Sequence, residues 1–186
     1  MDLHFATSNE NKFREAKEIL AKNRIKVLHF PFNHNEMRSD SLSEIAEEAV
    51  HAAYEKVKAP VFVEDAGLFI NALNGFPGTY SAWVQKKIGC DGILKLMQGI
   101  ENRSAEFRAT IAFTDGKEVH TFEGICQGSI AGQKFGSSGF GYDPIFIPEG
   151  YSQTFAQNIE IKNKLSHRYK SLLEFSEYLR GASISR

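Results

Sequence analysis

The sequence predicts an α/β protein built on a mixed β-sheet. In the first half of the chain, short apolar runs typical of buried strands alternate with segments of helical periodicity. Two long alternating segments follow, joined by Asp115-Gly116, and this pattern indicates an antiparallel hairpin. Helices and strands that first alternate and then give way to a hairpin favour a sheet with both parallel and antiparallel pairs.

The first elements are predicted from periodicity and helix-start signals. Residues 3–7 and 25–30 are expected to be strands, and residues 10–22 between them have apolar side chains at helical spacing. The polar segment 31–40 predicts a loop. Ser41 and Glu44 form a capping box that should open the next helix, because the serine can accept a hydrogen bond from the first helical turn.

The middle of the chain begins with a short apolar strand. Residues 61–63 are predicted to form this strand, which we expect to end at the polar sequence Glu64-Asp65-Ala66-Gly67. Two helical stretches should follow near 80–88 and 91–99. The sequence therefore places two carboxylates at a strand end, where ligands of open α/β sheets tend to bind.

The second half contains the hairpin and one more helix. Alternation over residues 107–113 and 118–130 predicts its two strands. A helix is expected over residues 166–179, with residues 181–186 as a frayed tail. We expect one domain of 186 residues, with one or two lobes.

Composition limits the classes of function. The formal net charge of -1 and the pI of about 6.6 argue against a large basic surface for nucleic acid. Cys90 and Cys126 have no metal-binding spacing, so neither a disulfide framework nor a zinc site is expected. No apolar run reaches the roughly 18 residues of a membrane span, and the N-terminus does not resemble a signal peptide. We therefore expect a cytoplasmic protein without membrane contact.

The first polar cluster is TSNENK, residues 7–12. A strand end followed by a helix start leaves backbone N–H groups that favour phosphate, and Lys12 could add a positive charge. The alternative is ordinary capping of the helix by Ser8 or Asn9. The segment is not a P-loop, because the GxxxxGK[ST] pattern is absent.

The second cluster is the acidic pair Glu64 and Asp65. Carboxylates beside an apolar strand suit a hard cation such as Mg²⁺, or one of them could deprotonate water. Neighbouring side chains in an extended segment point to opposite faces, so we expect different roles, with one acid in a salt bridge. The alternative is a solvated turn. Glu36 lies in the polar loop, and taken alone nothing around it indicates a function.

The third cluster is SHRYK, residues 166–170, with Lys162 upstream. Cations are unfavourable at a helix N-terminus because of the helix dipole, so Arg168 there indicates an anionic or carbonyl-rich ligand. The alternative is a solvated helix start.

The fourth cluster is GSSGFGYDPIF, residues 136–146. Its glycines permit positive φ and close backbone approach. Phe140 and Tyr142 could present ring faces to a nucleobase, and Asp143 could accept a hydrogen bond from a ring N–H. The alternative is a glycine-rich connection whose aromatic rings belong to the core.

In their order along the chain, these segments resemble the inosine-triphosphate pyrophosphatase family. The matching segments are TSNENK, VEDAGL, LNGFPGTYSAW, GFGYDPIF and KNKLSHR. The resemblance runs from residue 3 to about residue 180, and the last three segments together are highly specific.

This resemblance implies a fold and an activity. The fold would be an elongated mixed α/β fold with two lobes and a central substrate cleft, in a homodimer. The activity would be Mg²⁺-dependent hydrolysis of ITP, dITP and XTP to the nucleoside monophosphate and pyrophosphate, which removes these nucleotides from the pool.

The resemblance also implies roles for particular residues. Asp65 corresponds to the metal ligand and general base, Glu36 to a second metal ligand, and Glu64 to a secondary candidate ligand. Ala66 departs from the many members that have a substrate-contacting serine, and Ser8 from the many that have glycine. The remaining substrate-binding positions are Thr7, Asn9, Lys12, Phe140, Gly141, Tyr142, Asp143, Lys162, Ser166, His167 and Arg168.

Two other functions fit parts of this pattern. A non-catalytic purine-nucleotide sensor would need the same base and phosphate walls, but it would not need the acids Glu64, Asp65 and Glu36. A pyrophosphatase acting on modified pyrimidines is disfavoured by the GFGYDPIF and LSHR segments.

Overall fold

The protein is a mixed α/β fold, as predicted. The computed structural model describes residues 3–34 and 37–184, and in them a seven-stranded sheet has the order β2-β1-β3-β5-β6-β7, with β4 paired to β3. The strands are β1 (Leu3–Ala6), β2 (Val27–Phe30), β3 (Val61–Ile70), β4 (Pro77–Gly78), β5 (Ser104–Thr114), β6 (Val119–Ile130) and β7 (Phe146–Pro148).

Six α-helices and two short 3₁₀ helices accompany the strands of this described part. The α-helices are α1 (Glu10–Lys22), α2 (Leu42–Val57), α3 (Ser81–Lys87), α4 (Gly89–Leu96), α5 (Ile159–Leu165) and α6 (His167–Ile184), and the 3₁₀ helices are η1 (Asn71–Leu73) and η2 (Asp143–Ile145). None of the helices over residues 3–34 and 37–184 has the length and apolar character needed to span a membrane.

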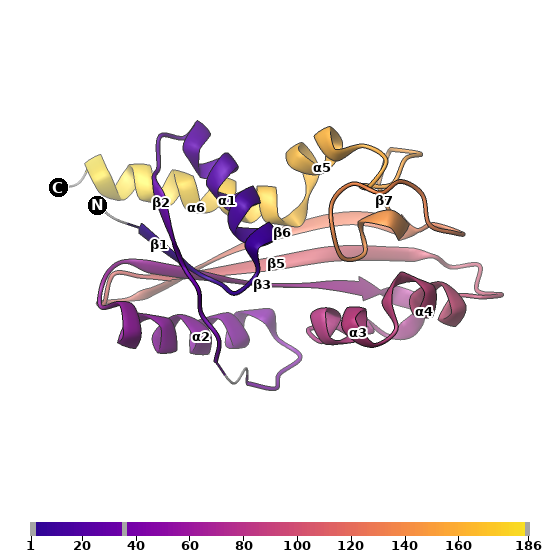
Figure 1. Ribbon diagram of the computed structural model, residues 1–186, viewed down its shortest axis with the longest axis horizontal. Coiled ribbons are helices and arrows are strands. Elements are labelled where there is room, and N and C mark those ends of the chain that lie inside the picture. The colour runs from indigo at the N-terminus through magenta and orange to yellow at the C-terminus, as the bar shows by residue number, and fades with distance from the viewer. Residues whose placement is uncertain (1–2, 35–36, 185–186) are drawn as a thin grey trace. The chain divides into compact units, whose positions relative to one another are not determined.

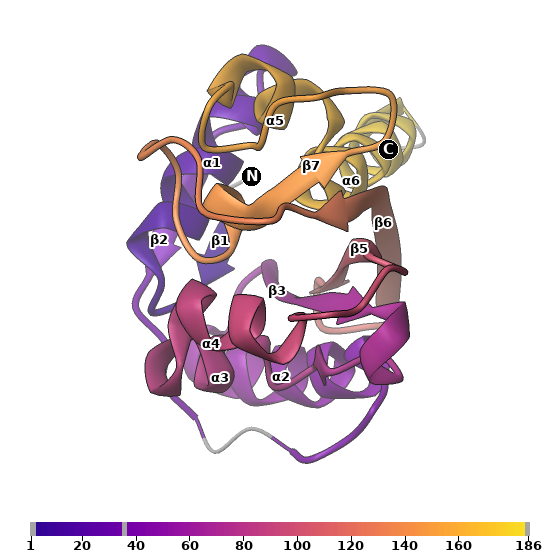
Figure 2. The same cartoon turned by 90° about the vertical axis from the view of Figure 1, so that its right-hand side faces the viewer.

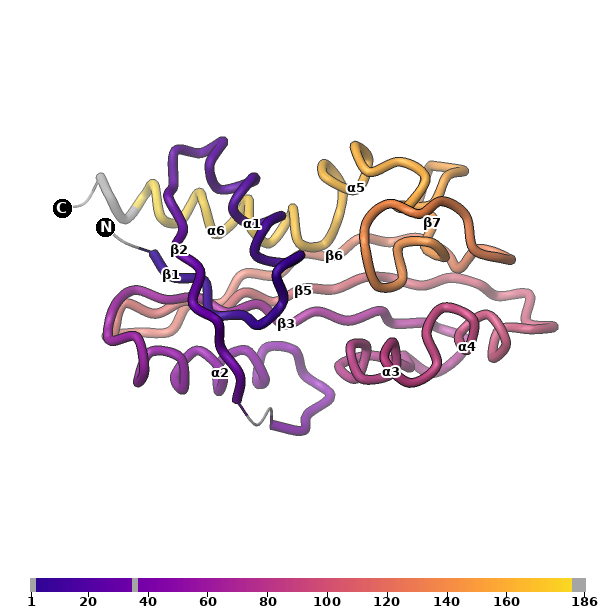
Figure 3. The backbone as a smooth tube through the Cα atoms, in the orientation of Figure 1, coloured from indigo at the N-terminus to yellow at the C-terminus, as the bar shows by residue number. Residues whose placement is uncertain are grey.

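The chain forms two compact units. Unit 1 contains residues 1–65, 109–124 and 168–186, and unit 2 contains residues 66–108 and 125–167. The chain therefore passes from one unit to the other four times, within β3, β5, β6 and α6, as can be followed in Figure 3.

Unit 1 has a helix layer on each face of its strands. β1 lies between β2 and the first part of β3, and both pairings are parallel. Phe5 and Phe62 stack at 4.3 Å and pack with residues of α1 and α6. On the other face, Val61 and Val63 pack against the alanine-rich side of α2. Figure 1 shows α2 on one side of these strands and α1 with α6 on the other.

Unit 2 is built around its own apolar core. The second part of β3 pairs with β4, and β6 pairs with β7, both antiparallel. Gly67 allows the β3–β4 approach, because a Cβ atom there would lie 2.2 Å from the carbonyl oxygen of Gly78. α3 and α4 follow each other beside these strands and contribute Val84 and Ile93 to the core (Figure 2).

The largest differences between predicted and observed boundaries are at the ends of β3 and α6. β3 does not end at Glu64 but continues to Ile70, because its second part pairs with β4. The acidic pair therefore lies inside a long strand. α6 likewise continues to Ile184, so residues 181–184 of the expected tail are helical, while Ser185 and Arg186 lie outside the described residues.

Candidate active site

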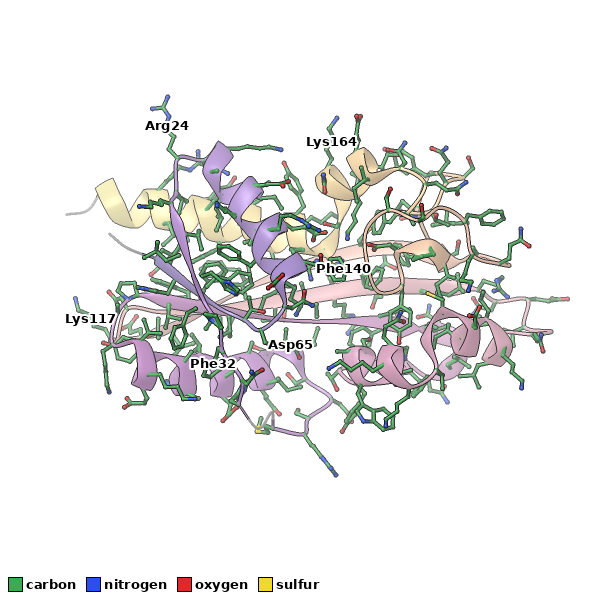
Figure 4. The ribbon with its side chains drawn as sticks, in the orientation of Figure 1. Arg24, Phe32, Asp65, Lys117, Phe140 and Lys164 are labelled. Atoms are coloured by element: carbon green, nitrogen blue, oxygen red, sulfur yellow. The ribbon has the colours of Figure 1, made fainter. Side chains whose placement is uncertain are left out.

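The two faces of β3 separate the adjacent acids Glu64 and Asp65. Phe62 packs with α1 and α6, whereas Val61 and Val63 pack with α2. Because side chains alternate along a strand, Glu64 points to the α1–α6 side and Asp65 to the α2 side. Figure 4 labels Asp65 on β3. The prediction that one acid of the pair makes a salt bridge is confirmed for Glu64.

Glu64 belongs to a buried ion cluster centred on Arg168. The Nε and Nη2 atoms of Arg168 donate to the two carboxylate oxygens of Glu64 at 2.7 and 2.9 Å, and Nη1 donates to Glu15 at 2.7 Å. The side chains of Arg168 and Glu64 are only 3% and 2% exposed. Burial alone would lower the pKa of Arg168, but the two carboxylates raise it above its ordinary value.

This cluster changes the interpretation of the cation at the start of α6. Arg168 was expected to need a ligand as its anionic partner, and the protein itself provides two carboxylates. One carboxylate comes from β3 and the other from α1, so Arg168 fastens the first turn of α6 to both elements.

The turn before α1 is ordered by its own side chains. Asn9 caps the helix, because its Oδ1 accepts hydrogen bonds from the backbone N–H groups of Asn11 and Lys12. Thr7 Oγ1 accepts from the N–H of Asn9 at 3.1 Å, and Ser8 is exposed. The capping alternative is therefore realised by Asn9.

Lys12 connects this turn to β3. Its Nζ donates to the backbone carbonyl of Glu64 at 3.0 Å and lies 4.0 Å from the Glu64 carboxylate. The side chain is 17% exposed. Unit 1 thus brings Thr7, Asn9, Lys12 and Arg168 together around the start of α1 and the middle of β3.

In unit 2, the central polar contact is a buried ion pair. Lys162 Nζ donates to Asp143 Oδ2 at 2.6 Å, and the two side chains are 2% and 4% exposed. The same carboxylate oxygen accepts the backbone N–H of Phe140 at 2.7 Å. Lys162 also lies 4.3 Å from the centre of the Phe140 ring, in a cation–π contact. Figure 4 labels Phe140, which precedes η2.

The structure explains why position 139 in this segment is a glycine. Its φ is +75°, and a Cβ atom there would lie 2.1 Å from Asp143 Oδ2. The group that approaches the backbone closely at Gly139 is therefore the carboxylate of Asp143. Gly136 serves a similar purpose, because a Cβ atom there would meet the backbone of Ala156 at 2.4 Å.

Other predicted wall residues are buried in unit 2. Tyr142 lies in the core, where its hydroxyl donates to the carbonyl of Ser81 at 3.1 Å, so its ring does not present a free face as expected. His167 stacks on Phe107 at 4.6 Å. Ser166 is buried and ends α5, with its N–H donating to the carbonyl of Lys162.

The metal-ligand prediction rests on Asp65 and Glu36. Glu36 lies outside the described residues, and within residues 3–34 and 37–184 no three His, Cys, Asp or Glu side chains are grouped as for a metal ion. Mg²⁺ commonly takes one or two carboxylates and completes its shell with water and substrate phosphates. The hard oxygen donors of Asp65 fit that requirement.

Sequence reasoning missed two residues of these clusters. Glu15 was not singled out, although it lies one helical turn after Lys12 on the same side of α1. Gln85 was also missed. Its Nε2 donates to the carbonyl of Gly141 at 3.1 Å, and nothing in the sequence near Gln85 signals this long-range contact.

Fold and site together define an α/β protein in which an Asn9-capped turn before α1 lies next to β3, the strand that carries the adjacent acids Glu64 and Asp65. Comparison with known proteins is more specific. Residues 3–178 match the model of the Ham1 family, and the chain belongs to this family. The resemblance found in the sequence motifs is thereby confirmed.

Relatives cover nearly the whole chain. A dITP/XTP pyrophosphatase of Thermococcus kodakarensis is 46% identical over 97% of this chain and 98% of its own length. One from Methanopyrus kandleri is 50% identical over 97% of each chain.

Solved structures show the same fold. The Ham1 protein of Staphylococcus aureus is 29% identical and superposes with a TM-score of 0.82 over 96% of this chain and 99% of its own. The HAM1 protein of Coxiella burnetii is 27% identical, with a TM-score of 0.85 over 97% of this chain and 100% of its own.

Proposed function

We propose that this protein is a nucleoside triphosphate pyrophosphatase that hydrolyses dITP, XTP and ITP to the monophosphate and pyrophosphate. The main support is that this chain is 46% and 50% identical, over nearly its full length, to relatives named dITP/XTP pyrophosphatase. The placement of Asp65 on β3, next to Glu64, supports this proposal because hydrolysis needs a carboxylate that can orient water.

Residues of unit 1 would bind the triphosphate and activate water. The turn over residues 7–12 offers backbone N–H groups at the start of α1, and Lys12 offsets phosphate charge. Asp65 would orient the attacking water and accept its proton. Since pyrophosphate is the leaving group, attack occurs at the α-phosphorus.

Asp65 and Glu36 would hold the Mg²⁺ ion. We leave Glu64 out of this set, because both of its carboxylate oxygens accept hydrogen bonds from Arg168. When bound, the ion would offset negative charge that develops on the phosphoryl oxygens.

Residues of unit 2 would recognise the purine. A 6-oxopurine presents the acceptor O6 beside the donor N1–H, whereas adenine presents a 6-amino donor beside a bare N1. The Lys162–Asp143 pair offers a donor and an acceptor next to the Phe140 ring. Mismatched polar groups in such a site can discriminate by about 10⁴. Among the cations of the predicted substrate-binding positions, we assign the O6 donor to Lys162, because the guanidinium of Arg168 is directed at Glu64 and Glu15.

We further propose a cytoplasmic homodimer. Residues 76–96 of unit 2 carry several exposed apolar side chains, called here the apolar surface of residues 76–96, and they support dimerisation because exposed apolar residues often mark protein interfaces. These side chains are Phe76, Tyr80, Trp83, Ile88 and Leu96. A cytoplasmic location fits an enzyme that acts on the nucleotide pool.

The catalytic assignment is tested by Asp65→Asn. The amide keeps the size of the side chain but cannot accept the proton of water, so we expect pyrophosphate release from dITP to fall by about 10² or more with an unchanged circular dichroism spectrum. Asp115→Asn, in the turn between β5 and β6, is the matched control. If Asp65→Asn retains near-normal rates, Asp65 is not the base.

The sensor alternative makes a different prediction. A non-catalytic module would bind dITP and release no pyrophosphate, with or without Mg²⁺. The same assay on the unmodified protein therefore separates the two functions.

A further inference from the structure

Helices α3 and α4 hold the backbone of the segment 140–143 through the carbonyl of Gly141. Gln85 of α3 donates to this oxygen through Nε2 at 3.1 Å. Cys90 of α4 donates to the same oxygen through Sγ at 3.4 Å. Two donors from different helices thus converge on one peptide of the segment proposed to recognise the purine.

A third hydrogen bond fastens the neighbouring residue to the same helix. The hydroxyl of Tyr142 donates to the carbonyl of Ser81, the first residue of α3. The ring of Tyr142 packs in the core of unit 2 with Val84 and Cys90. Helices α3 and α4 therefore hold residues 141 and 142 by hydrogen bonds.

Gly141 depends on this support for its conformation. Its φ is +65°, and a Cβ atom there would meet no atom within 4 Å, so no neighbour packs against that side of the residue. A glycine peptide with open space around it can rotate readily. The hydrogen bonds to its carbonyl restrict that rotation directly, in addition to the bonds that join Phe140 and Asp143 on either side of it.

Gln85 is the stronger of the two donors. Burial raises the pKa of the Cys90 thiol, so the group is protonated at neutral pH and able to donate. Thiols are nevertheless weak donors, whereas an amide N–H forms an ordinary hydrogen bond. Removing Gln85 should therefore disturb the Gly141 peptide more than removing Cys90.

We infer that Gln85 is a positioning residue that sets base selectivity. It acts by fixing the Gly141 peptide, and through it the neighbouring Phe140 and Asp143. This inference rests on the proposed function, in which residues 140–143 recognise the purine. The residues assigned to the triphosphate belong to unit 1, whereas Gln85 and its partners belong to unit 2, so selectivity changes while triphosphate binding does not.

The test is Gln85→Leu, which removes the donor and keeps a similar volume. Steady-state kinetics with dITP, XTP and dATP give the selectivity, and competitive inhibition by inorganic tripolyphosphate reports the phosphate site alone. We expect the dITP-to-dATP ratio of kcat/KM to fall roughly three- to tenfold, the rate equivalent of one hydrogen bond. The tripolyphosphate inhibition constant should stay unchanged.

Three further variants sharpen the comparison. Gln85→Lys restores a donor and should recover most of the selectivity. Cys90→Ala removes the weaker donor and should lower the ratio by less, and it serves as the second test if Gln85→Leu does not fold. Gln127→Leu makes the same chemical change elsewhere in unit 2, at a residue that bonds to Glu106, and should leave the ratio unchanged.

The possible results are distinguishable. An unchanged dITP-to-dATP ratio in a folded Gln85→Leu protein overturns the inference. So does an equal loss for every substrate and for tripolyphosphate, because that indicates general damage. An unmodified protein that releases no pyrophosphate from dITP overturns the proposed function itself, which is a separate outcome.

Discussion

Arg168 carries the guanidinium that lies between the carboxylates of Glu64 and Glu15 in unit 1. A buried ion pair contributes little relative to an apolar replacement of both partners, but removing one partner is costly. We expect Arg168→Ala to lower the free energy of unfolding by about 3–5 kcal/mol, measured by urea denaturation.

The matched control for this variant is Arg180→Ala, at an exposed position of the same helix. It should change the free energy of unfolding by less than about 0.5 kcal/mol. If Arg168→Ala is as stable as the control, the ion cluster does not stabilise unit 1.

Arg168 also shows what could and could not be predicted from the sequence for a single residue. The helix-dipole argument indicated an anionic or carbonyl-rich ligand for the cation at the start of α6, whereas the anionic groups that pair with it in the structure are carboxylates of the protein. It could not name the partner, because Glu64 and Glu15 lie 104 and 153 residues away in the chain. Lys162 and Asp143 were likewise recognised separately, and only the structure pairs them.

At the scale of elements, local signals predicted most of the secondary structure. α1 spans residues 10–22 as predicted, and α2 begins directly after Ser41, whose Oγ accepts the N–H of Glu44. Nearby residues specify these elements, because they provide the caps and the apolar side chains at helical spacing.

The segments that were missed either depend on distant pairing or are short. The second part of β3 contains Glu64, Asp65 and Gly67, which favour a turn, but pairing with β4 keeps it extended. β7 and α5 were not predicted, because they have only three and seven residues and little periodicity.

The loop that precedes η2 makes a testable prediction at this scale. In Gly139→Ala, the new methyl group must displace the Asp143 carboxylate and the residue must keep a positive φ. A non-glycine residue in this conformation costs about 1–2 kcal/mol. We expect at least that loss in the free energy of unfolding, together with a lower kcat/KM for dITP.

Gly132→Ala is the control for this loop. Its φ is not positive and no atom lies within 4 Å of the added methyl group, so the variant should behave like the unmodified protein. An unaffected Gly139→Ala protein would contradict the close approach of Asp143.

At the scale of the whole molecule, the apolar surface of residues 76–96 bears on assembly. Trp83 is 61% exposed and is the largest side chain in it. If this surface joins two copies, Trp83→Glu places a charge in an apolar interface. We expect the dissociation constant of the dimer to rise by at least about tenfold.

Sedimentation velocity over a range of concentrations measures this change. Lys117→Glu, in the turn between β5 and β6, introduces the same side chain outside residues 76–96 and should leave assembly unchanged. A dimer that withstands Trp83→Glu would place the interface elsewhere, and a monomeric unmodified protein would refute the homodimer.

The central claim concerns the reaction, and product analysis tests it most directly. The purified protein is incubated with Mg²⁺ and, separately, dITP, XTP, ITP, ATP or GTP, and both pyrophosphate and orthophosphate are measured. We predict rapid pyrophosphate release from the first three and little from ATP and GTP. Orthophosphate as the product would place attack at the terminal phosphorus and contradict the mechanism, and tight nucleotide binding without any product would favour a sensor.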